Sequence, residues 1–378
     1  MAKSPQSKQY TVLHVGKFYP PHMGGMEIYL QQLVVGQSTS IDVAAIVAND
    51  ARHTQVEYRD GAKIVRAAAF GSVASMPIVP TLAWQIRQHD SSLIHLNTPN
   101  PGAAFALLAS GHRGKLIVTH HADTLGRKLL RRISDPFVAK IMERAAAIIV
   151  TSKGYLDSSE ELAPYREKCR VIPLGIEATP FEGLDTSASH AIRTRFGNRL
   201  ILAVGRLVPY KGFEYLIRSM RDVHGVLLLI GTGPLRESLL RTIKECGVED
   251  KVTVLGHVDE ITPYYKAASM LVIPSVTRAE AFGVVQLEAM ASGIPVINTN
   301  IPSGVPEVSV HGQTGLTVPP RDAGALADAI NTLLDDEGLR EKFGQMARER
   351  VRNKFSVESM VAQTRDLYAS VMASSSPP

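Results

Sequence analysis

Cysteine is nearly absent from this chain of 378 residues, with Cys169 and Cys246 as the only two, in separate halves. Two distant cysteines exclude a disulfide framework, and without a CxxC pair a structural zinc site is not expected, so a reducing, cytoplasmic setting is the default. The first ten residues lack the apolar segment of a signal peptide. Because the longest apolar runs are far shorter than the roughly 20 residues that cross a bilayer, we expect a soluble or peripheral protein.

The chain also lacks a large excess of charge of either sign. The formal net charge is +5, and charged residues make up 20% of the chain against 45% hydrophobic residues. This composition is typical of a globular protein, and it permits an anionic ligand or membrane surface without requiring nucleic acid. Lysine and arginine are scattered, with no basic tract rich in aromatic residues, so we expect no nucleic-acid partner.

The dinucleotide-binding pattern GxGxxG is absent as well. The glycines after the first apolar run have the wrong spacing, and the segment Ile230-Gly-Thr-Gly lacks a third glycine. A nicotinamide dehydrogenase is therefore disfavoured.

Short apolar runs recur between stretches with helical periodicity. Most of them show no alternation, which is typical of strands covered on both faces, so the pattern predicts α/β domains with parallel sheets. The expected strands are 11–15, 42–47, 62–67, 93–96, 116–119, 147–151 and 169–172, then 200–205, 226–231, 252–255, 270–273, 295–298 and 315–318. Expected helices include 25–35, 136–146, 213–220, 234–246, 284–291 and 323–334.

The chain is long enough for two domains. A turn-rich stretch at 177–183 separates the two series of strands, so we place the domains at 1–180 and 181–356. A last helical segment within 357–378 is expected to pack back on the first domain.

Two carboxylates, Glu280 and Glu288, stand eight positions apart where a loop turns into an apolar helix. Since eight helical residues rise about 12 Å, Glu280 would stand before the helix and Glu288 up to two turns behind its start. Gly283 allows a ligand close to the backbone, and the N–H groups of Gly283, Val284 and Val285 would face an anion. This arrangement suits a nucleoside diphosphate sugar, with the sugar and the ribose at the two acids. The alternative is a buried helix whose acids cap it or pair with arginine.

Two cations, Arg206 and Lys211, flank a turn directly after the strand expected at 200–205. Ligands of open α/β sheets bind beyond the carboxyl ends of strands, and two fixed cations there suit a diphosphate. A solvated loop is the alternative.

Two further segments follow strands of the first half. Gly24 and Gly25 open a helix and could bring backbone to the phosphates, or could form a structural turn. His120 and His121 are consecutive, so in a strand they point to opposite sides and only one enters a cleft. Neither HxH nor HExxH is present, so zinc is not expected.

A basic amphipathic stretch covers 127–133 and continues with Lys140 and Arg144. It could be a solvated helix face or a contact with an anionic membrane surface.

Taken together, these motifs resemble the family 4 retaining glycosyltransferases of the GT-B fold. Glu280 and Glu288 resemble that family's E-x7-E signature, 205–212 its diphosphate-binding turn, 24–25 its glycine loop and 118–123 its strand-end histidine motif. The likeness covers nearly the whole chain. It implies two Rossmann-like domains facing across a donor-binding cleft, with an N-terminal acceptor domain (1–180) and a C-terminal nucleotide-sugar-binding domain (181–356).

The resemblance also implies roles for single residues. Glu280 would hold donor-sugar hydroxyls beside the amides of Phe282 and Gly283, and Glu288 would accept both ribose hydroxyls. His121, which matches the family histidine best, would contact the donor sugar near the reacting carbon. Arg206 and Lys211 would neutralise the diphosphate, and the base would lie against Gly256, His257 and Val258.

We therefore expect a retaining hexosyltransferase that moves a sugar from a nucleoside diphosphate to a hydroxyl of a glycan or lipid-linked acceptor, in polysaccharide or glycolipid biosynthesis. Front-side attack accounts for retention, because no carboxylate for a double displacement is identifiable. No metal cofactor is expected, since the chain has no Asp-x-Asp motif to contradict the family's metal-free habit. Segments 118–123 and 150–152 resemble bacterial mannosyltransferases of exopolysaccharide or O-antigen assembly and favour GDP-mannose, with UDP-sugars left open.

Two rival functions fit the same motifs. A nucleotide-sugar epimerase of this architecture would change the sugar without an acceptor. A non-catalytic nucleotide-sugar-binding protein would bind the donor without transferring or hydrolysing it.

Overall fold

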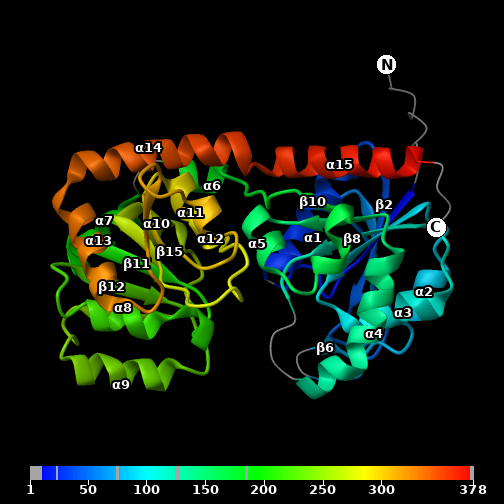
Figure 1. Cartoon of the computed structure of the whole chain (residues 1–378), viewed down its shortest axis with the longest axis horizontal. Coiled ribbons are helices and arrows are strands. Elements are labelled where there is room, and N and C mark those ends of the chain that lie inside the picture. The colour runs from blue at the N-terminus through cyan, green and yellow to red at the C-terminus, as the bar shows by residue number, and fades with distance from the viewer. Residues whose placement is uncertain (1–10, 23, 74–75, 124–127, 184–185, 375–378) are drawn as a thin grey trace. The chain divides into compact units, whose positions relative to one another are not determined.

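The computed structural model describes residues 11–22, 24–73, 76–123, 128–183 and 186–374, without the side chains of 128–134. The chain forms two compact units (Figure 1). The first consists of Met1–Thr151, Ser159–Gly175 and Val357–Pro378, and the second of Ser152–Ser158 and Ile176–Ser356. The chain thus leaves the first unit and returns to it with its C-terminal helix.

The first unit is built on an eight-stranded sheet with the order β10-β9-β8-β7-β1-β2-β4-β3. All neighbouring strands are parallel except the hairpin β3–β4. The strands are β1 (Thr11–Val15), β2 (Asp42–Ala48), β3 (Gln55–Arg59), β4 (Ala62–Ala67), β7 (Leu93–Thr98), β8 (Lys115–His120), β9 (Ala147–Val150) and β10 (Cys169–Val171), with a separate ribbon of β5 (Ser72–Val73) and β6 (Met76–Pro77).

Helices pack around this sheet in two groups (Figure 1). α1 (Gly25–Gln37) packs against α15 (Val357–Ala373), so the last helix of the chain lies beside the first. α2 (Leu82–Arg87), α3 (Pro101–Ser110) and α4 (Lys128–Arg144) pack together, and a 3-10 helix spans Ala163–Lys168.

The second unit has a six-stranded parallel sheet with the order β13-β12-β11-β14-β15-β16, the strand order of a Rossmann fold. Its strands are β11 (Leu200–Val204), β12 (Val226–Ile230), β13 (Val252–Gly256), β14 (Met270–Ile273), β15 (Val296–Thr299) and β16 (Gly315–Val318). Its helices are α5 (Lys153–Ser158), α6 (Thr179–Glu182), α7 (Ser187–Phe196), α8 (Phe213–Ser219), α9 (Arg236–Cys246), α10 (Thr262–Ala267), α11 (Val285–Ser292), α12 (Val305–Val308), α13 (Ala323–Asp335) and α14 (Glu337–Lys354), with a 3-10 turn at Pro209–Lys211.

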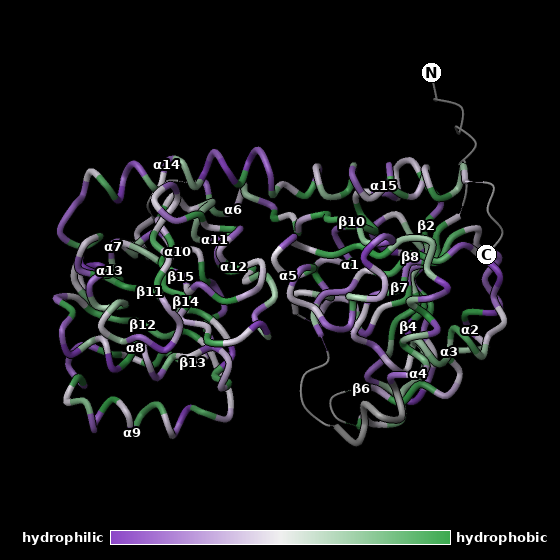
Figure 2. The backbone as a smooth tube through the Cα atoms, viewed as in Figure 1, coloured by the Kyte–Doolittle hydropathy of each residue, from purple (hydrophilic) through white to green (hydrophobic). Residues whose placement is uncertain are grey.

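The strands are apolar because helices cover both faces of each sheet, and Figure 2 shows them as hydrophobic segments inside each unit. Leu227 and Leu229 of β12, for example, are fully buried in the core of the second unit. The predicted α/β class and the predicted strands are confirmed, with ends that differ by one or two residues. The predicted helix 136–146 was wrong at its start, because α4 begins at Lys128 and holds Pro136 in its interior.

Each sheet reverses its strand order at one place. In the first unit β1 lies between β2 and β7, and in the second β11 lies between β12 and β14. Loops that leave the carboxyl ends of the two strands at such a point diverge and leave room for a ligand. Of the candidate site residues, Gly24 and Gly25 follow β1, Arg206 and Lys211 follow β11, and Glu280 follows β14, whereas His121 follows β8 and His257 and Val258 follow β13.

None of the helices in the described part of the chain combines the length and apolar character needed to cross a membrane. Of the basic stretch 127–133, Arg127 lies outside the described residues, and α4 carries the remainder, with side chains that are also outside them.

Two histidines lie in the core of the first unit. His14 of β1 is fully buried and its Nε2 lies 3.1 Å from Oε1 of Gln37. Burial lowers the pKa of His14 to about 4, and burial together with His14 and His121 lowers the pKa of His95 well below its usual value. Both rings are therefore neutral in the folded protein at pH 7, whereas in the unfolded chain they accept a proton near pH 6.5.

This difference predicts acid destabilisation of the first unit. As the pH falls, the unfolded chain binds these protons before the folded protein does. The free energy of unfolding is therefore highest above about pH 6.5 with respect to these two groups. It decreases as the pH drops from about 6.5 towards about 4, by up to about 1.4 kcal/mol per pH unit for each histidine. Unfolding followed by calorimetry from pH 7 to pH 5 should show a shallower dependence in His14→Gln. An unchanged slope in that variant would contradict the assignment.

Candidate nucleotide-sugar site

Lys211 and Glu280 form the central contact of the second unit. Nζ of Lys211 lies 2.6 Å from Oε2 of Glu280, and the two side chains are only 11% and 10% exposed. Lys211 ends the 3-10 turn after β11, and Glu280 lies in the loop after β14, so they meet at the strand-order reversal. Ser275 donates a further hydrogen bond to the same carboxylate oxygen at 3.1 Å. The structure thus brings together a cation and an acid that the sequence analysis assigned to one ligand.

Close packing of the backbone explains the glycines after β12. Gly231 has a φ of +146°, and a Cβ there would collide with the carbonyl oxygen of Gly205, at the end of β11. The segment with two glycines therefore allows the ends of β11 and β12 to pack tightly.

The loop after Glu280 leads into α11. Gly283 adopts a φ of +73°, and the amides of Gln286 and Leu287 donate to the carbonyls of Gly283 and Val284 at 2.9 and 2.8 Å. The amides of Gly283, Val284 and Val285 precede these bonds at the positive end of the helix dipole, where an anion is stabilised. Phe282 beside them is buried.

Glu288 lies near the start of α11, within the predicted limit of two turns. Because the backbone from Glu280 to Gly283 is not helical and α11 begins at Val285, Glu288 lies in the first turn of α11. Its Oε2 accepts a hydrogen bond of 2.6 Å from the hydroxyl of Tyr265. Burial raises the pKa of the Glu288 carboxyl, and the bond from Tyr265 acts in the opposite direction.

A buried amide network fixes the start of α11. Nε2 of Gln286 donates to the carbonyl of Phe282 at 3.0 Å, and Nδ2 of Asn298 on β15 donates to Oε1 of Gln286 at 3.1 Å. All of these side chains are buried, so the loop that carries the acid pair is anchored to the sheet.

The remaining residues predicted in the second unit are more open. Arg206 is exposed directly after β11. Gly256 ends β13, His257 is exposed beside Asp259 with Nε2 and Oδ1 3.6 Å apart, and Val258 is half-buried. These residues follow β11 and β13 at the same edge of the sheet as Lys211.

In the first unit the two consecutive histidines point to different partners. Nε2 of His121 lies 3.1 Å from Oδ1 of Asn97, and the ring of Tyr29 packs edge-on at 4.8 Å between centroids. Burial, with His120 as a smaller cause, lowers the pKa of His121 to about 3. His121 is therefore a neutral hydrogen-bonding group at pH 7.

His120 lies among acids instead. Its Nε2 is 3.4 Å from Oδ1 of Asp123 and 3.7 Å from Oε2 of Glu161, and the ligand atoms of the three residues lie within 4.8 Å of one another. Within the described residues this is the group whose spacing could hold a metal ion. It does not include His121 or any residue of the acid pair.

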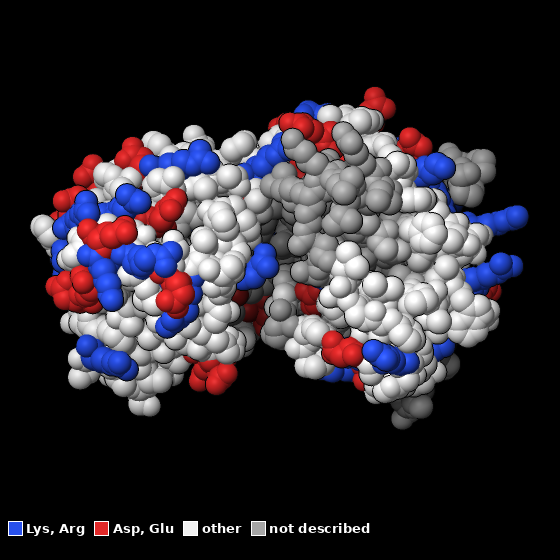
Figure 3. Space-filling view, turned by 90° about the horizontal axis from the view of Figure 1, so that it is seen from below, with Lys and Arg blue, Asp and Glu red and all other residues white. Residues whose placement is uncertain are grey.

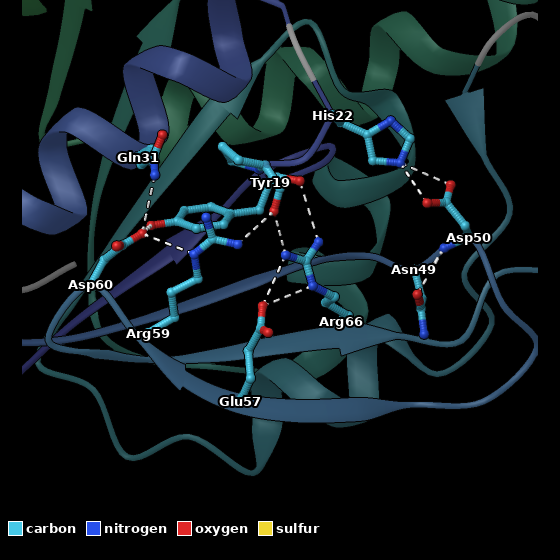
Figure 4. A network of polar contacts seen from close by, with 10 residues as sticks. Tyr19, His22, Gln31, Asn49, Asp50, Glu57, Arg59, Asp60 and Arg66 are labelled. Atoms are coloured by element: carbon cyan, nitrogen blue, oxygen red, sulfur yellow. Dashed lines mark hydrogen bonds and ion pairs between the residues drawn. The ribbon is translucent and has the colours of Figure 1, made fainter.

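Gly24 caps α1 and Gly25 begins it, and a side chain at Gly25 would face open space. The loop before them is clamped by the β3–β4 hairpin (Figure 4). Arg66, only 8% exposed, donates to the carbonyls of Tyr19 and Pro20 while Glu57 holds its guanidinium at 2.9 Å.

The same loop is held by a second set of contacts (Figure 4). The hydroxyl of Tyr19 donates to Asp60 at 2.8 Å, and Gln31 of α1 donates to the same carboxylate at 3.2 Å. His22 lies 2.7 Å from Asp50. The hairpin thus fixes the approach to Gly24 and Gly25.

Sequence reasoning missed the residues that support the site. Asn97 could have been found, because it is the polar residue that ends the apolar run of β7. No signal in the sequence connects Tyr265 with Glu288 or Arg66 with Tyr19, since each pair meets only through the fold.

Comparison with known proteins agrees with this geometry. The family Glycosyl transferases group 1 matches residues 188–350, and the family Glycosyltransferase Family 4 matches residues 23–179. The O-antigen chain mannosyltransferase C of Escherichia coli is 27% identical over 97% of this chain and 100% of its own length. A GDP-mannose-dependent alpha-(1-6)-phosphatidylinositol monomannoside mannosyltransferase of Mycobacterium tuberculosis is 29% identical over 94% and 97%.

Solved structures give the same fold. Sucrose-phosphate synthase from Thermosynechococcus elongatus superposes with a TM-score of 0.79 and 25% identity over 97% of this chain and 100% of that one. Anabaena Alr3699/HepE, in complex with UDP and glucose, has a TM-score of 0.77 and 21% identity over 96% and 100%. The chain belongs to glycosyltransferase family 4 and has the GT-B fold. It is a glycosyltransferase, as the resemblance in its sequence predicted.

The clamp on the glycine loop can be tested with Arg66→Lys. Lysine keeps the charge but cannot bond two carbonyls and a carboxylate in one plane, so we expect kcat/KM for sugar transfer to fall about tenfold, the effect of about 1.4 kcal/mol. Arg52→Lys, at an exposed position of the same unit, is the matched control in the same steady-state assay. Wild-type kinetics in Arg66→Lys would show that the clamp does not position the loop.

Proposed function

We propose that this glycosyltransferase moves a hexose, mannose from GDP-mannose, to a hydroxyl of a glycan or lipid-linked acceptor with retention of configuration. The observation that carries the proposal is the ion pair of Lys211 and Glu280 beside the start of α11. At this place, beyond the carboxyl ends of the strands of one sheet, a cation that can bind phosphate lies beside an acid that can bind sugar hydroxyls. The amides at the start of α11 can bind an anion there as well.

The chemistry follows from where charge develops. When the bond between the sugar carbon and the phosphate oxygen breaks, negative charge grows on the diphosphate and positive charge on the ring. Lys211, Arg206 and the amides of Gly283, Val284 and Val285 stabilise the first. The acceptor hydroxyl attacks from the same face, and its proton passes to the departing phosphate oxygen. Glu280 holds the sugar hydroxyls and His121 contacts the sugar.

The names of relatives favour mannose as the sugar. The Escherichia coli relative is called a mannosyltransferase, and the Mycobacterium tuberculosis relative is called GDP-mannose-dependent. The structure in complex with UDP and glucose supports a UDP-sugar as the alternative donor. We assign the nucleotide to the second unit, with the ribose on Glu288 and the base near Gly256, His257 and Val258, and the acceptor to the first unit. We assign no role to a bound metal.

Removing a cation from the diphosphate should slow transfer. Lys211→Ala and Arg206→Ala are each expected to lower kcat about 10²–10³-fold. Loss of one preorganised charge raises the activation free energy by about 3–4 kcal/mol. Transfer is measured with GDP-mannose and with UDP-glucose, and Lys244→Ala on the exposed face of α9 serves as the control.

Product analysis separates the rival functions. Anomeric NMR of the product should show the configuration of the donor, and transfer should persist in EDTA. A changed sugar formed without an acceptor indicates an epimerase, and binding of donor with neither transfer nor hydrolysis indicates a binding protein. A loss of tenfold or less in both variants removes Arg206 and Lys211 from the site.

We also propose that the protein works in the cytoplasm at an anionic membrane surface. α4, which carries most of the basic stretch, packs on α3 through an edge-on contact of Phe105 and Phe137 at 5.2 Å. Nearby, Trp84 of α2 and Phe105 remain 58% and 54% exposed. Figure 3 shows uncharged atoms over much of the described surface of this unit on that side, with both basic and acidic side chains around them. Exposed aromatic residues beside basic ones are typical of surfaces that bind lipid.

Liposome flotation tests this contact. The protein should float with vesicles that contain anionic lipid at low salt and should be released at high salt, because the attraction is screened. Arg131→Glu with Arg132→Glu should abolish flotation, whereas Arg241→Glu with Lys244→Glu on α9 should not. If the wild-type protein does not bind at low salt, the proposed membrane contact is wrong.

A further inference from the structure

A continuous set of polar side chains crosses the buried face of the first sheet beneath α1 and α15. His95 of β7 bonds through Nδ1 to the hydroxyl of Tyr368 on α15 and through Nε2 to the hydroxyl of Thr119, at 2.6 Å. Thr119 lies 2.9 Å from the hydroxyl of Tyr29 on α1. All four side chains are buried. We call Tyr368, His95, Thr119 and Tyr29 the polar column.

The polar column ends at His121. The ring of Tyr29 meets the imidazole at 82° with 4.8 Å between centroids. His121 directly follows β8 and its amide continues the pairing with β7 by donating to the carbonyl of Thr98 at 3.0 Å. Because Thr119 and His121 are two residues apart, they point to the same side of the sheet, as do His95 and Asn97 on β7. Asn97, 1% exposed, holds Nε2 of His121 from the neighbouring strand. Two contacts from different elements therefore restrict one ring.

The hydrogen bonds of the polar column have a direction. Thr119 is the partner that the structure gives to the Tyr29 hydroxyl, and a buried hydroxyl proton left without an acceptor is costly. Tyr29 therefore donates to Thr119, Thr119 donates to Nε2 of His95, and His95 donates from Nδ1 to Tyr368. Each hydroxyl can donate only one proton, so the choice of donor between Tyr29 and Thr119 fixes the donor in the bond between His95 and Tyr368.

The contact with Asn97 sets the proton on His121. Oδ1 of Asn97 can only accept, so with this orientation of the amide Nε2 of a neutral His121 carries the proton and Nδ1 carries the lone pair, while Nδ2 of Asn97 is buried without a partner among the described residues. Burial keeps the ring neutral, because the pKa of His121 is lowered to about 3.

We infer that Asn97 and Tyr29 are positioning residues that hold His121 as its Nε2–H tautomer, and that Tyr368 brings the C-terminal helix into this arrangement through His95 and Thr119. The consequence is that Nδ1 of His121 serves as a hydrogen-bond acceptor for a sugar hydroxyl and does not act as a proton donor. This inference rests on the proposed role of His121 at the donor sugar. It gives α15, which follows directly on the last residue of the second unit, a fixed link to the first unit's site.

The test is a long-range 1H–15N NMR experiment on the full chain labelled with 15N-histidine, with His121 assigned through His121→Gln. We expect the wild type to show one neutral Nε2–H species for His121 at pH 7. Asn97→Leu should give a mixture of tautomers, whereas Asn97→Asp, which keeps the acceptor oxygen, should keep the proton on Nε2 and raise the pKa of His121 through its negative charge. Tyr368→Phe should shift the ring nitrogens of both His95 and His121. Tyr165→Phe removes a phenol bond in the same unit away from the polar column and is the control.

Kinetics supply the second readout. Asn97→Leu and Tyr368→Phe should lower kcat about three- to tenfold with little change in acceptor KM, while Tyr165→Phe stays at the wild-type rate. If Tyr368→Phe lowers the melting temperature no more than the control and leaves the His121 nitrogens and kcat unchanged, the link to α15 is wrong. A wild-type His121 protonated on Nδ1 overturns the tautomer assignment.

The NMR result stands apart from the proposed function. If the nitrogen shifts follow this pattern but His121→Gln transfers sugar at the wild-type rate, the positioning is supported and the role of His121 at the donor is refuted.

Discussion

The ion pair of Lys211 and Glu280 depends on the reversal of strand order in the second sheet. β11 and β14 are neighbours although β12 and β13 lie between them in the sequence, so the loops that leave their carboxyl ends share one place. Taking two charges out of water costs several kcal/mol for each, and neither side chain would be stable in this position without the other. The amide network of Gln286 and Asn298 then fixes the loop that presents Glu280, and α11 starts a few residues later.

Much of the fold could be predicted because helices cover both faces of the sheets. A strand buried on both sides must be apolar throughout, so β1, β12 or β14 stand out as short runs without alternation. β3 was missed for the opposite reason. Its residues Gln55–Arg59 lie at the edge of the sheet, antiparallel to β4, and are mostly exposed, so the sequence there carries no apolar run. The start of α4 was misplaced because Pro136 favours a first turn but is tolerated inside this helix.

The site was predictable where one segment carries all the parts of a motif. Glu280, Gly283 and Glu288 follow each other closely, and Lys211 belongs to a turn with its own glycines. The position of Glu288 along the helix could be given from the sequence only as an upper limit of two turns. It lies in the first turn of α11 because the loop before it is not helical. Partners such as Tyr265 come from other elements, and a sequence contains no local trace of a contact that the packing of α10 creates.

Two groups of buried polar side chains, one in each unit, are held in different ways. In the second, Lys211 and Glu280 form an ion pair, and Ser275 donates a further hydrogen bond to Glu280. In the first, desolvation holds His14, His95 and His121 neutral, and each ring has at least one uncharged hydrogen-bond partner, although Nδ1 of His14 has none. Under the proposed function this division has a use. A diphosphate leaving group needs fixed positive charge, which the second unit supplies, whereas a sugar ring that gains positive charge is best met by groups that bond its hydroxyls without adding a cation.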